Sequence, residues 1–368
     1  MKIPFNYLPQ QFANLKPYFV QWKKLVKTTE FTLGPFVNEF EKTFAKYIGV
    51  KYCISTNNGT DALILCLKSL NIGKGDEVIT VCNSFYATVG AIVACGATPV
   101  LVDCDERYQI NIKKIEKKIS KKTKAILPVH WGGASPDMSQ IMALSKKYKI
   151  KIIEDACMGI GAKINGKSPG SFGIVSAFSM HPLKSLNVMG DGGMVVTNNK
   201  KISTWLRKYR NHGMINRDEI EFWGVNNRLQ PLQAIVANKE LSKIEKVIEK
   251  RNNNARLMDK LLRQLSPNVI IPKRPKGYLE TFALYMCLVN KRDSLIRYLR
   301  KKKIETKIHY PIPLNRQKAA KKLKLNQKDF NVANYQSKKL ITLPIHQYLN
   351  RENIIFIAKE IKNFYKNR

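Results

Sequence analysis

Short apolar runs alternate with longer helical runs through the middle of this chain. The runs that predict strands cover residues 52–55, 77–81, 99–102, 125–129 and 152–153. The runs that predict helices cover residues 61–70, 86–94 and 138–148. Strands that alternate with helices build a mainly parallel sheet with helices on both of its faces. Ligands bind such α/β sheets at the carboxyl ends of the strands, where we therefore expect the functional site.

The start of the chain follows a different pattern. Residues 1–50 predict an approach segment with one helix, over residues 36–47. Phe36, Phe40 and Phe44 recur there at helical spacing and would form one apolar face.

Beyond residue 200 the alternation of strands and helices is lost. The pattern predicts one or two long helices over residues 232–262, a strand at 285–289, and helices at 293–301 and 353–365. We therefore predict a large α/β domain, residues 1–240, and a smaller C-terminal α+β domain, residues 241–368.

One stretch, residues 175–197, combines strand, turn and glycine signals around a single lysine. Its sequence is VSAFSMHPLKSLNVMGDGGMVVT. The apolar ends predict two buried strands, and Pro182 keeps the residues before Lys184 out of a helix. The stem of Lys184 would then point into the protein, where desolvation lowers the pKa of the amine and makes it a nucleophile. The competing interpretation is an ordinary surface lysine, because the chain is rich in lysine.

Three further features lie where strands are predicted to end or helices to begin. The turn at residues 57–61, NNGTD, could bind an anion at a helix N-terminus, although an ordinary helix cap would use the same residues. Asp155 follows an apolar strand and is either a cap or the partner of a cationic group. Phe85 precedes a helix, and core packing would explain it nearly as well.

The composition is that of a globular protein with a large excess of basic residues. Hydrophobic residues make up 44% and charged residues 25%, and the formal net charge is +37. Such a charge could indicate nucleic-acid binding, but no basic run is interleaved with aromatic residues as a stacking surface would require. We interpret the charge as a compositional preference for lysine, which would also attract an anionic substrate.

The cysteines and the hydropathy of the chain indicate the cellular compartment in which we expect the protein. The seven cysteines form no CxxC pair, and no set of metal ligands is expected. No run is long and apolar enough to cross a membrane, and the N-terminal residues lack the apolar core of a secretory signal. We expect reduced thiols in a cytoplasmic protein.

Taken together, these features resemble the DegT/DnrJ/EryC1/StrS family of sugar aminotransferases, which have the aspartate aminotransferase fold and use pyridoxal phosphate. The resemblance covers nearly the whole chain. The matching segments are TLGPFVNEFEKTFAKYIGVKYCISTNNGTDAL (32–63), NSFYATVGAIVACGATPVLVD (83–103), PVHWGG (128–133), EDAC (154–157), FSMHPLK (178–184), GDGG (190–193), RNHG (210–213), GVNNR (224–228), QAIVA (233–237), HYPIPLN (309–315) and LP (343–344).

The resemblance implies roles for three residues around the cofactor ring. Lys184 corresponds to the lysine that binds the cofactor aldehyde and then moves the substrate proton. Asp155 corresponds to the carboxylate that keeps the pyridine nitrogen protonated. Phe85 corresponds to the aromatic side chain that stacks on the ring.

The resemblance also assigns the phosphate and substrate contacts. Gly59, Thr60 and Ser179 correspond to the phosphate cradle. Asn226 corresponds to an asparagine that reaches the phosphate from the neighbouring subunit, which implies a homodimer, and Arg228 is a further candidate for the same anion.

His309 and Tyr310 lie in a segment that borders the substrate pocket in the family. A structural turn around Pro311 and Pro313 is the competing interpretation of this segment.

Two positions depart from the family's usual pattern. Met158 stands where a Gln or His usually contacts the phenolic oxygen of the cofactor, and methionine cannot donate that hydrogen bond. Trp131 is bulkier than the usual residue. A subset of the family carries His in place of the lysine and removes a hydroxyl group, and Lys184 argues against that activity here.

The function implied is transfer of an amino group from L-glutamate or L-glutamine to a nucleotide-diphosphate-linked keto sugar, in amino-sugar or cell-surface polysaccharide synthesis. Lys307 and Arg316 flank the HYPIPLN segment and could meet the pyrophosphate, unless both are solvated surface charges. Two alternatives stay open. One is an aminotransferase for a keto-inositol or another polyol ketone, and the other is a non-enzymatic basic binding protein on the same fold.

Overall fold

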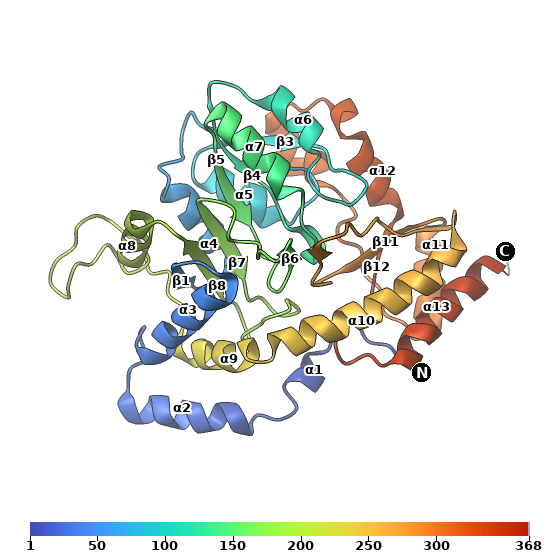
Figure 1. Ribbon diagram of the computed structural model, residues 1–368, viewed down its shortest axis with the longest axis horizontal. Coiled ribbons are helices and arrows are strands. Elements are labelled where there is room, and N and C mark those ends of the chain that lie inside the picture. Colours follow the sequence, from blue (N-terminus) through green and yellow to red (C-terminus); the bar gives the residue numbers. More distant parts are fainter. Residues whose placement is uncertain (367–368) are drawn as a thin grey trace.

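A seven-stranded sheet forms the core of the computed structural model, which describes residues 1–366 (Figure 1). Across the sheet the strands lie in the order β1 (Tyr52–Thr56), β8 (Gly193–Thr197), β7 (Val175–Ser179), β5 (Lys151–Asp155), β4 (Thr123–Leu127), β2 (Glu77–Val81) and β3 (Thr98–Val102). Within the described residues β8 is antiparallel to both of its neighbours, whereas the adjacent pairs from β7 to β3 are parallel. The mainly parallel sheet predicted from the sequence is therefore confirmed.

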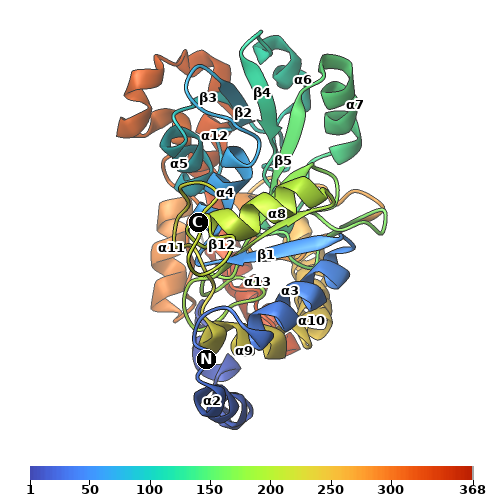
Figure 2. The same ribbon diagram turned by 90° about the vertical axis from the view of Figure 1, so that its left-hand side faces the viewer.

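Helices cover both faces of this sheet. Those named here are α3 (Pro35–Ile48), α4 (Gly59–Lys68), α5 (Tyr86–Ala94), α7 (Met138–Tyr148), α8 (Lys200–Tyr209) and α9 (Pro231–Leu241). Ile54 and Val195 lie opposite each other on β1 and β8 and pack in one buried layer with α4 and α8. The next pair, Cys53 and Val196, packs in a second layer with α3 and α9. Figure 2 accordingly shows α4 and α8 on one side of β1, and α3 and α9 on the other.

The N-terminal region contains more helix than predicted. The prediction of a single helix before residue 50 is wrong, because α1 (Leu8–Gln11) and α2 (Lys16–Thr28) precede α3. The buried residues of α2 are Tyr18 and Leu25, and this spacing is too sparse to predict an amphipathic helix. Contacts with α9 hold α2 in place, since the Tyr18 hydroxyl donates to Glu240 over 2.6 Å and Trp22 Nε1 donates to the Leu232 carbonyl over 3.0 Å.

A second, smaller sheet lies in the C-terminal part of the chain. Its strands lie in the order β12 (Leu340–Leu343), β11 (Tyr285–Val289) and β9 (Val269–Ile270). The helices packed with it are α10 (Ile244–Leu262), α11 (Arg292–Lys301) and α13 (Arg351–Lys366), which share a buried cluster with these strands. The start of the chain joins this part, because Ile3 forms a parallel bridge with Ile304.

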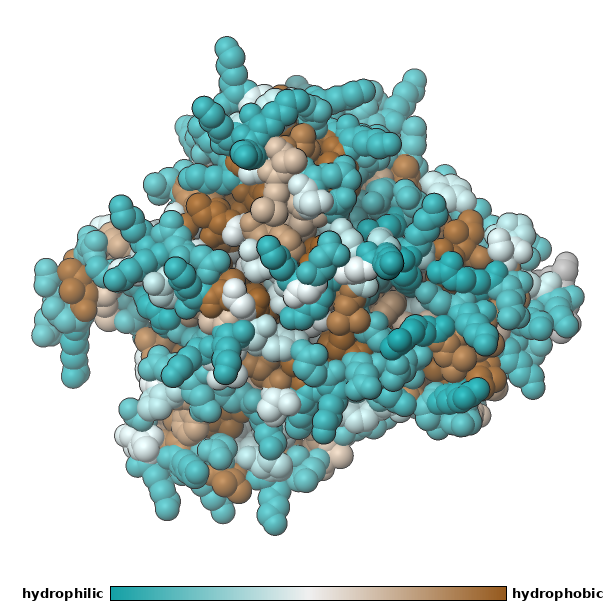
Figure 3. Space-filling model, in the orientation of Figure 1, coloured by the Kyte–Doolittle hydropathy of each residue, from teal (hydrophilic) through white to brown (hydrophobic). Residues whose placement is uncertain are grey.

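Several shorter elements do not belong to either of these two sheets. They are α6 (Ile112–Ile115), α12 (Asn331–Lys339) and the antiparallel pair β6 (Lys163–Ile164) and β10 (Tyr278–Leu279). No helix among residues 1–366 has both the length and the apolar character needed to span a membrane. Hydrophilic side chains cover most of the face shown in Figure 3, as the excess of lysine and arginine implies.

Candidate active site

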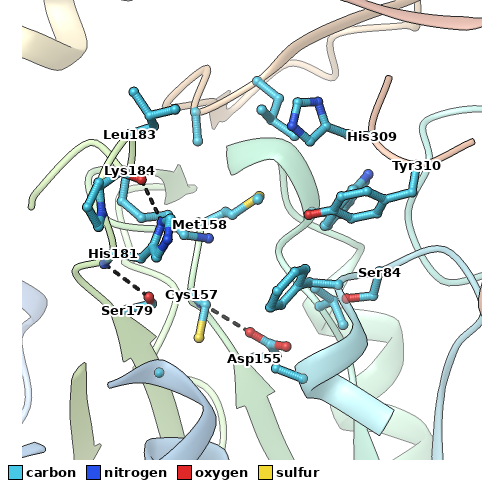
Figure 4. Close-up of a pocket in the computed structure, with 18 of the residues that line it drawn as sticks. Ser84, Asp155, Cys157, Met158, Ser179, His181, Leu183, Lys184, His309 and Tyr310 are labelled. Carbon is cyan, nitrogen blue, oxygen red and sulfur yellow. Dashed lines mark hydrogen bonds between the residues drawn. The ribbon is translucent and has the colours of Figure 1, made fainter. Parts of the chain in front are cut away.

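Segments from distant parts of the chain meet at the carboxyl ends of β5 and β7 and line one pocket. Eight of the ten residues predicted for the site line this pocket: Gly59, Thr60, Phe85, Asp155, Ser179, Lys184, His309 and Tyr310. In Figure 4, Lys184 lies on one side, His309 and Tyr310 lie on the other, and Asp155 lies at the floor. The site therefore occupies the edge of the sheet expected from its topology.

Lys184 lies in the loop between β7 and β8, where its backbone is held at both ends. Its N–H donates to the His181 carbonyl over 3.1 Å, and its carbonyl accepts from the Tyr7 hydroxyl over 2.9 Å. No ion pair among residues 1–366 includes the Lys184 amine. Burial lowers the pKa of this amine below the usual lysine value, although Cys157 and Asp155 act in the opposite direction.

Asp155 ends β5 and is 4% exposed. Thr88 Oγ1 donates to Asp155 Oδ2 over 2.7 Å, and the Cys157 N–H donates to Oδ1 over 3.2 Å. In the part of the chain that the structure describes, no cationic side chain pairs with this carboxylate. Because a buried carboxylate is costly without a partner, the floor of the pocket suits a ligand that carries a positive charge.

The N-terminus of α4 forms the anion-binding wall of the pocket. The Asn58 side chain caps the helix by accepting from the Asp61 N–H over 2.8 Å. The N–H groups of the first turn, including those of Gly59 and Thr60, have no acceptor inside the helix. A Cβ on Gly59 would lie 2.6 Å from Ser179 Cβ, so glycine is needed for the helix to approach the end of β7. These donors and the helix dipole suit a phosphate group.

Aromatic rings form another wall. Phe85 precedes α5 and is 46% exposed, so it is not a core residue. Its ring centroid lies 5.2 Å from that of Tyr86 and 5.9 Å from that of Tyr310. The ring centroid of the buried Trp131 lies 5.5 Å from that of Tyr310. These rings offer flat apolar surfaces on which an aromatic or sugar ring could stack.

His309 and Tyr310 present neutral hydrogen-bonding groups. Burial lowers the pKa of His309 to about 4, and the nearby charges of Lys184 and Lys307 act in the same direction. The imidazole is therefore uncharged at neutral pH, and its Nδ1 lies 2.9 Å from Thr342 Oγ1. Burial raises the pKa of Tyr310, so its phenol keeps its proton.

Asn226 and Arg228 do not line the pocket of their own chain. Both lie in the segment between α8 and α9, where Asn226 forms an antiparallel bridge with Asn211. Arg228 Nε donates to Asn226 Oδ1, and Arg228 Nη1 donates to Asn211 Oδ1, each over 2.9 Å. Their neighbour Asn227 reaches the turn before α4, because its Oδ1 accepts from the Asn57 N–H over 3.3 Å. The exposed Asn226 is accessible to a second subunit, and its role there stays a prediction.

Met158 lines the pocket next to Lys184 (Figure 4). Its carbonyl accepts from Thr281 Oγ1 over 3.3 Å, which fixes the backbone and leaves the thioether in the pocket wall. A thioether cannot donate a hydrogen bond, so this wall offers a ligand a soft apolar contact.

Sequence reasoning missed several pocket residues. Thr88 holds Asp155, and its position three residues after Phe85 at the start of a helix could have identified it. Tyr7, Arg251 and His346 also line the pocket. No local pattern marks these three residues, because the packing of the N-terminus and the C-terminal part brings them to the site.

Comparison with known proteins identifies a family and several relatives. The sequence profile of the DegT/DnrJ/EryC1/StrS aminotransferase family matches residues 19–362. A dTDP-3-amino-3,6-dideoxy-alpha-D-galactopyranose transaminase from Aneurinibacillus thermoaerophilus is 37% identical, with 93% of each chain covered. A UDP-N-acetyl-3-dehydro-alpha-D-glucosamine 3-aminotransferase from Acidithiobacillus ferrooxidans is also 37% identical, over 98% of this chain and 97% of that protein.

Solved structures share the fold. The structure of ntda from Bacillus subtilis, with bound cofactor PMP, superposes with a TM-score of 0.92 at 27% identity. The superposition covers 99% of this chain and 85% of that one.

Proposed function

Because the chain belongs to the DegT/DnrJ/EryC1/StrS aminotransferase family, we propose that it uses pyridoxal phosphate to transfer an amino group from glutamate or glutamine to a nucleotide-linked keto sugar. The observation that carries the proposal is that Lys184, Asp155 and the N-terminus of α4 line one pocket. They provide an amine for an aldehyde, a carboxylate for a cationic ring nitrogen, and a cradle for a phosphate. The product would be an amino sugar of the kind used in polysaccharides.

The pocket fits the cofactor group by group. Lys184 would bind the aldehyde carbon, Asp155 the ring nitrogen and Phe85 the face of the ring. The first turn of α4 and Ser179 would hold the phosphate. The fit is supported by the lack of a charged partner for either Lys184 or Asp155 among the described residues. When bound, the cofactor supplies an electron-withdrawing ring that stabilises negative charge on the reacting carbon.

The protein's own side chains then hold and move protons. The lowered pKa of Lys184 makes more of the free amine available at neutral pH, so the amine can accept a proton from one carbon and return it to another. Thr88 and the Cys157 N–H each donate to Asp155 and fix the orientation of its carboxyl group at the floor of the pocket. Phe85 and Trp131 line the pocket with apolar surface and exclude water from part of it.

The nature of the acceptor is supported by the relatives and by charge. Two relatives are named for dTDP-linked and UDP-linked sugars. The neutral His309 and Tyr310 can form hydrogen bonds with sugar hydroxyls. Lys307 and Arg316 flank them in the sequence, and a net charge of +37 attracts a pyrophosphate.

The test compares three acceptors on the amine-loaded protein. A nucleotide-linked keto sugar should restore the absorbance of the aldehyde form of the cofactor. We expect the same sugar without the nucleotide to need at least about tenfold higher concentration, because it cannot form the charge-assisted hydrogen bonds that the pyrophosphate forms. A keto-inositol is the third acceptor. Preference for either unlinked ketone would contradict the substrate assignment. A protein that binds no cofactor and reacts with no ketone would instead be a non-enzymatic binder.

We also propose that the working unit is a homodimer in which Asn226 reaches the partner's phosphate. Asn226→Ala is then expected to weaken cofactor binding by about tenfold or more, since a hydrogen bond to a charged group is lost. The matched control is Arg217→Ala, an exposed change in the same loop. Titration with the cofactor measures its affinity, and sedimentation measures whether the protein is a monomer or a dimer. Full cofactor affinity in a dilute monomer would refute the shared site.

Met158→Gln is expected to lower the pH at which the absorbance of the bound cofactor changes. An amide N–H that reaches the phenolic oxygen favours its charged form, and a hydrogen bond of this kind shifts a pKa by up to about one unit. Spectral titration of the holoenzyme measures the midpoint, with Met142→Gln as an exposed control outside the pocket. An unchanged midpoint would mean that residue 158 does not reach the ring.

The seven cysteines support a reducing compartment. All are free thiols, five of them buried and two half-buried. Because unpaired thiols persist where glutathione keeps them reduced, we propose that the protein works in the cytoplasm.

A further inference from the structure

A buried arginine lines the same pocket and is only partly satisfied. Arg251 on α10 is 1% exposed. Its Nε donates to Gln347 Oε1 over 3.0 Å, and its Nη1 donates to the Phe282 carbonyl over 3.3 Å and to Ser185 Oγ over 3.4 Å. The centroid of the Tyr7 ring lies 5.2 Å from Arg251 Cζ. Among residues 1–366, its buried Nη2 has no hydrogen-bond partner.

Arginines in comparable surroundings have carboxylate partners. The buried Arg210 pairs with Glu41, and the half-buried Arg274 pairs with Asp259 over 3.2 Å. No ion pair in the described part of the chain includes Arg251. Because burial of an unpaired cation is costly, the missing negative charge is expected from a ligand of the pocket.

A second unpartnered group lies beside Arg251. His346, which is 4% exposed, uses Nε2 to donate to the Pro4 carbonyl over 3.1 Å, so its Nδ1 is an acceptor. This Nδ1 has no partner among the described residues. The ring of Tyr7 lies against both groups, because its centroid is 5.3 Å from that of His346 and 5.2 Å from Arg251 Cζ. Two unsatisfied polar groups on one wall mark a polar subsite.

We propose that Arg251 binds the α-carboxylate of the amino donor. The inference rests on the function proposed above. Ser185, which accepts from Arg251, directly follows Lys184, so the guanidinium lies beside the lysine that takes part in nitrogen transfer. The α-carboxylate sits on the carbon that carries the transferred nitrogen. Glutamate and glutamine share this group, so one arginine serves either donor.

The unaltered holoenzyme provides the first test. Its cofactor absorbance is followed after mixing with L-glutamate, L-glutamine or the α-amide of L-glutamate. We expect the α-amide to require at least about tenfold higher concentration than glutamate for the same absorbance change. Its amide group carries no negative charge to pair with Arg251. Equal use of glutamate and its α-amide overturns the role of Arg251 and leaves the proposed function standing. If no amino donor changes the absorbance, both proposals fail.

Variants test whether Arg251 is the group responsible. Arg251→Gln is expected to bring the ratio between glutamate and its α-amide close to one, and Arg251→Lys to keep part of the preference. The control is Arg256→Gln, an exposed change on the same helix. Calorimetry with 2-methylglutamate, which cannot transfer its nitrogen by loss of an α-proton, measures donor binding without turnover.

Two outcomes would overturn the inference. An equal loss with all three donors would indicate a purely structural arginine. A loss confined to an acidic keto sugar would assign Arg251 to the acceptor. If Arg251→Gln does not fold, the comparison of donors on the unaltered protein decides the question.

Discussion

Alanine in place of Lys184 is expected to lower the rate of amino transfer by about 10⁴-fold, the upper range of general acid–base catalysis by one side chain. The structure offers no replacement, because no other lysine among residues 1–366 lines the pocket. Lys184→Arg is expected to be nearly as inactive, since its guanidinium keeps its proton at any working pH. The rate of a single turnover measures the loss, and Lys167→Ala, an exposed change, is the control.

Two measurements locate the reactive amine without turnover. Borohydride reduction of the holoenzyme followed by peptide mapping should label Lys184, and a label on another lysine would refute its role. In the cofactor-free protein, the lowered pKa leaves more of the amine unprotonated at a given pH. Lys184 should therefore react with an amine reagent at a lower pH than exposed lysines such as Lys167.

The sheet and the presence of Lys184 and Asp155 in one pocket could be predicted because their signals are local. The segment around Lys184 carries two strands, a proline and a glycine-rich turn within residues 175–197, and the structure forms β7 and β8 there. Asp155 follows an apolar strand, and parallel strands bring their carboxyl ends to one edge. The helical pattern over residues 232–262 was also correct, although it could not decide between one helix and the observed α9 and α10.

The parts that escaped prediction depend on packing between distant segments. The helix α2 buries few side chains and is held by contacts with α9, so its hydrophobic pattern is weak. Tyr7 and Arg251 reach the pocket only because the N-terminus and α10 pack beside the loop of Lys184. The function of a neighbouring subunit cannot be read from one chain, so the contact of Asn226 stays a prediction.

The resemblance to the family is confirmed by the profile that matches residues 19–362, and with it the prediction of an aminotransferase. The division after residue 240 stays a prediction. It falls in the last turn of α9, next to the break before α10. The buried cluster around the smaller sheet includes residues of α10, β11 and α13 together with Ile3, so the start of the chain packs with the C-terminal part.

Asp155→Asn is the second change with a large expected effect. The amide keeps the size of the carboxylate, and its oxygen can still accept from Thr88 Oγ1, which now lies 2.7 Å from Oδ2. What is lost is the negative charge opposite the ring nitrogen. Breaking a buried charge pair costs about 3–5 kcal/mol, which corresponds to a rate lower by about 200-fold to 5,000-fold. Turnover by the holoenzyme measures the loss, and near-normal activity would refute the assignment.

Stability separates this electrostatic role from simple damage to the fold. In the cofactor-free protein, Asp155 is a buried carboxylate with no cationic partner among the described residues, so its neutral isostere relieves a desolvation cost. We therefore expect Asp155→Asn without cofactor to melt at the same temperature as the unaltered protein or higher. Asp137→Asn, which changes a capping carboxylate of α7 outside the pocket, should leave turnover unchanged. A variant at residue 155 that lost both activity and thermal stability without cofactor would show that the carboxylate also supports the fold, as the acceptor for Thr88 Oγ1 and the Cys157 N–H.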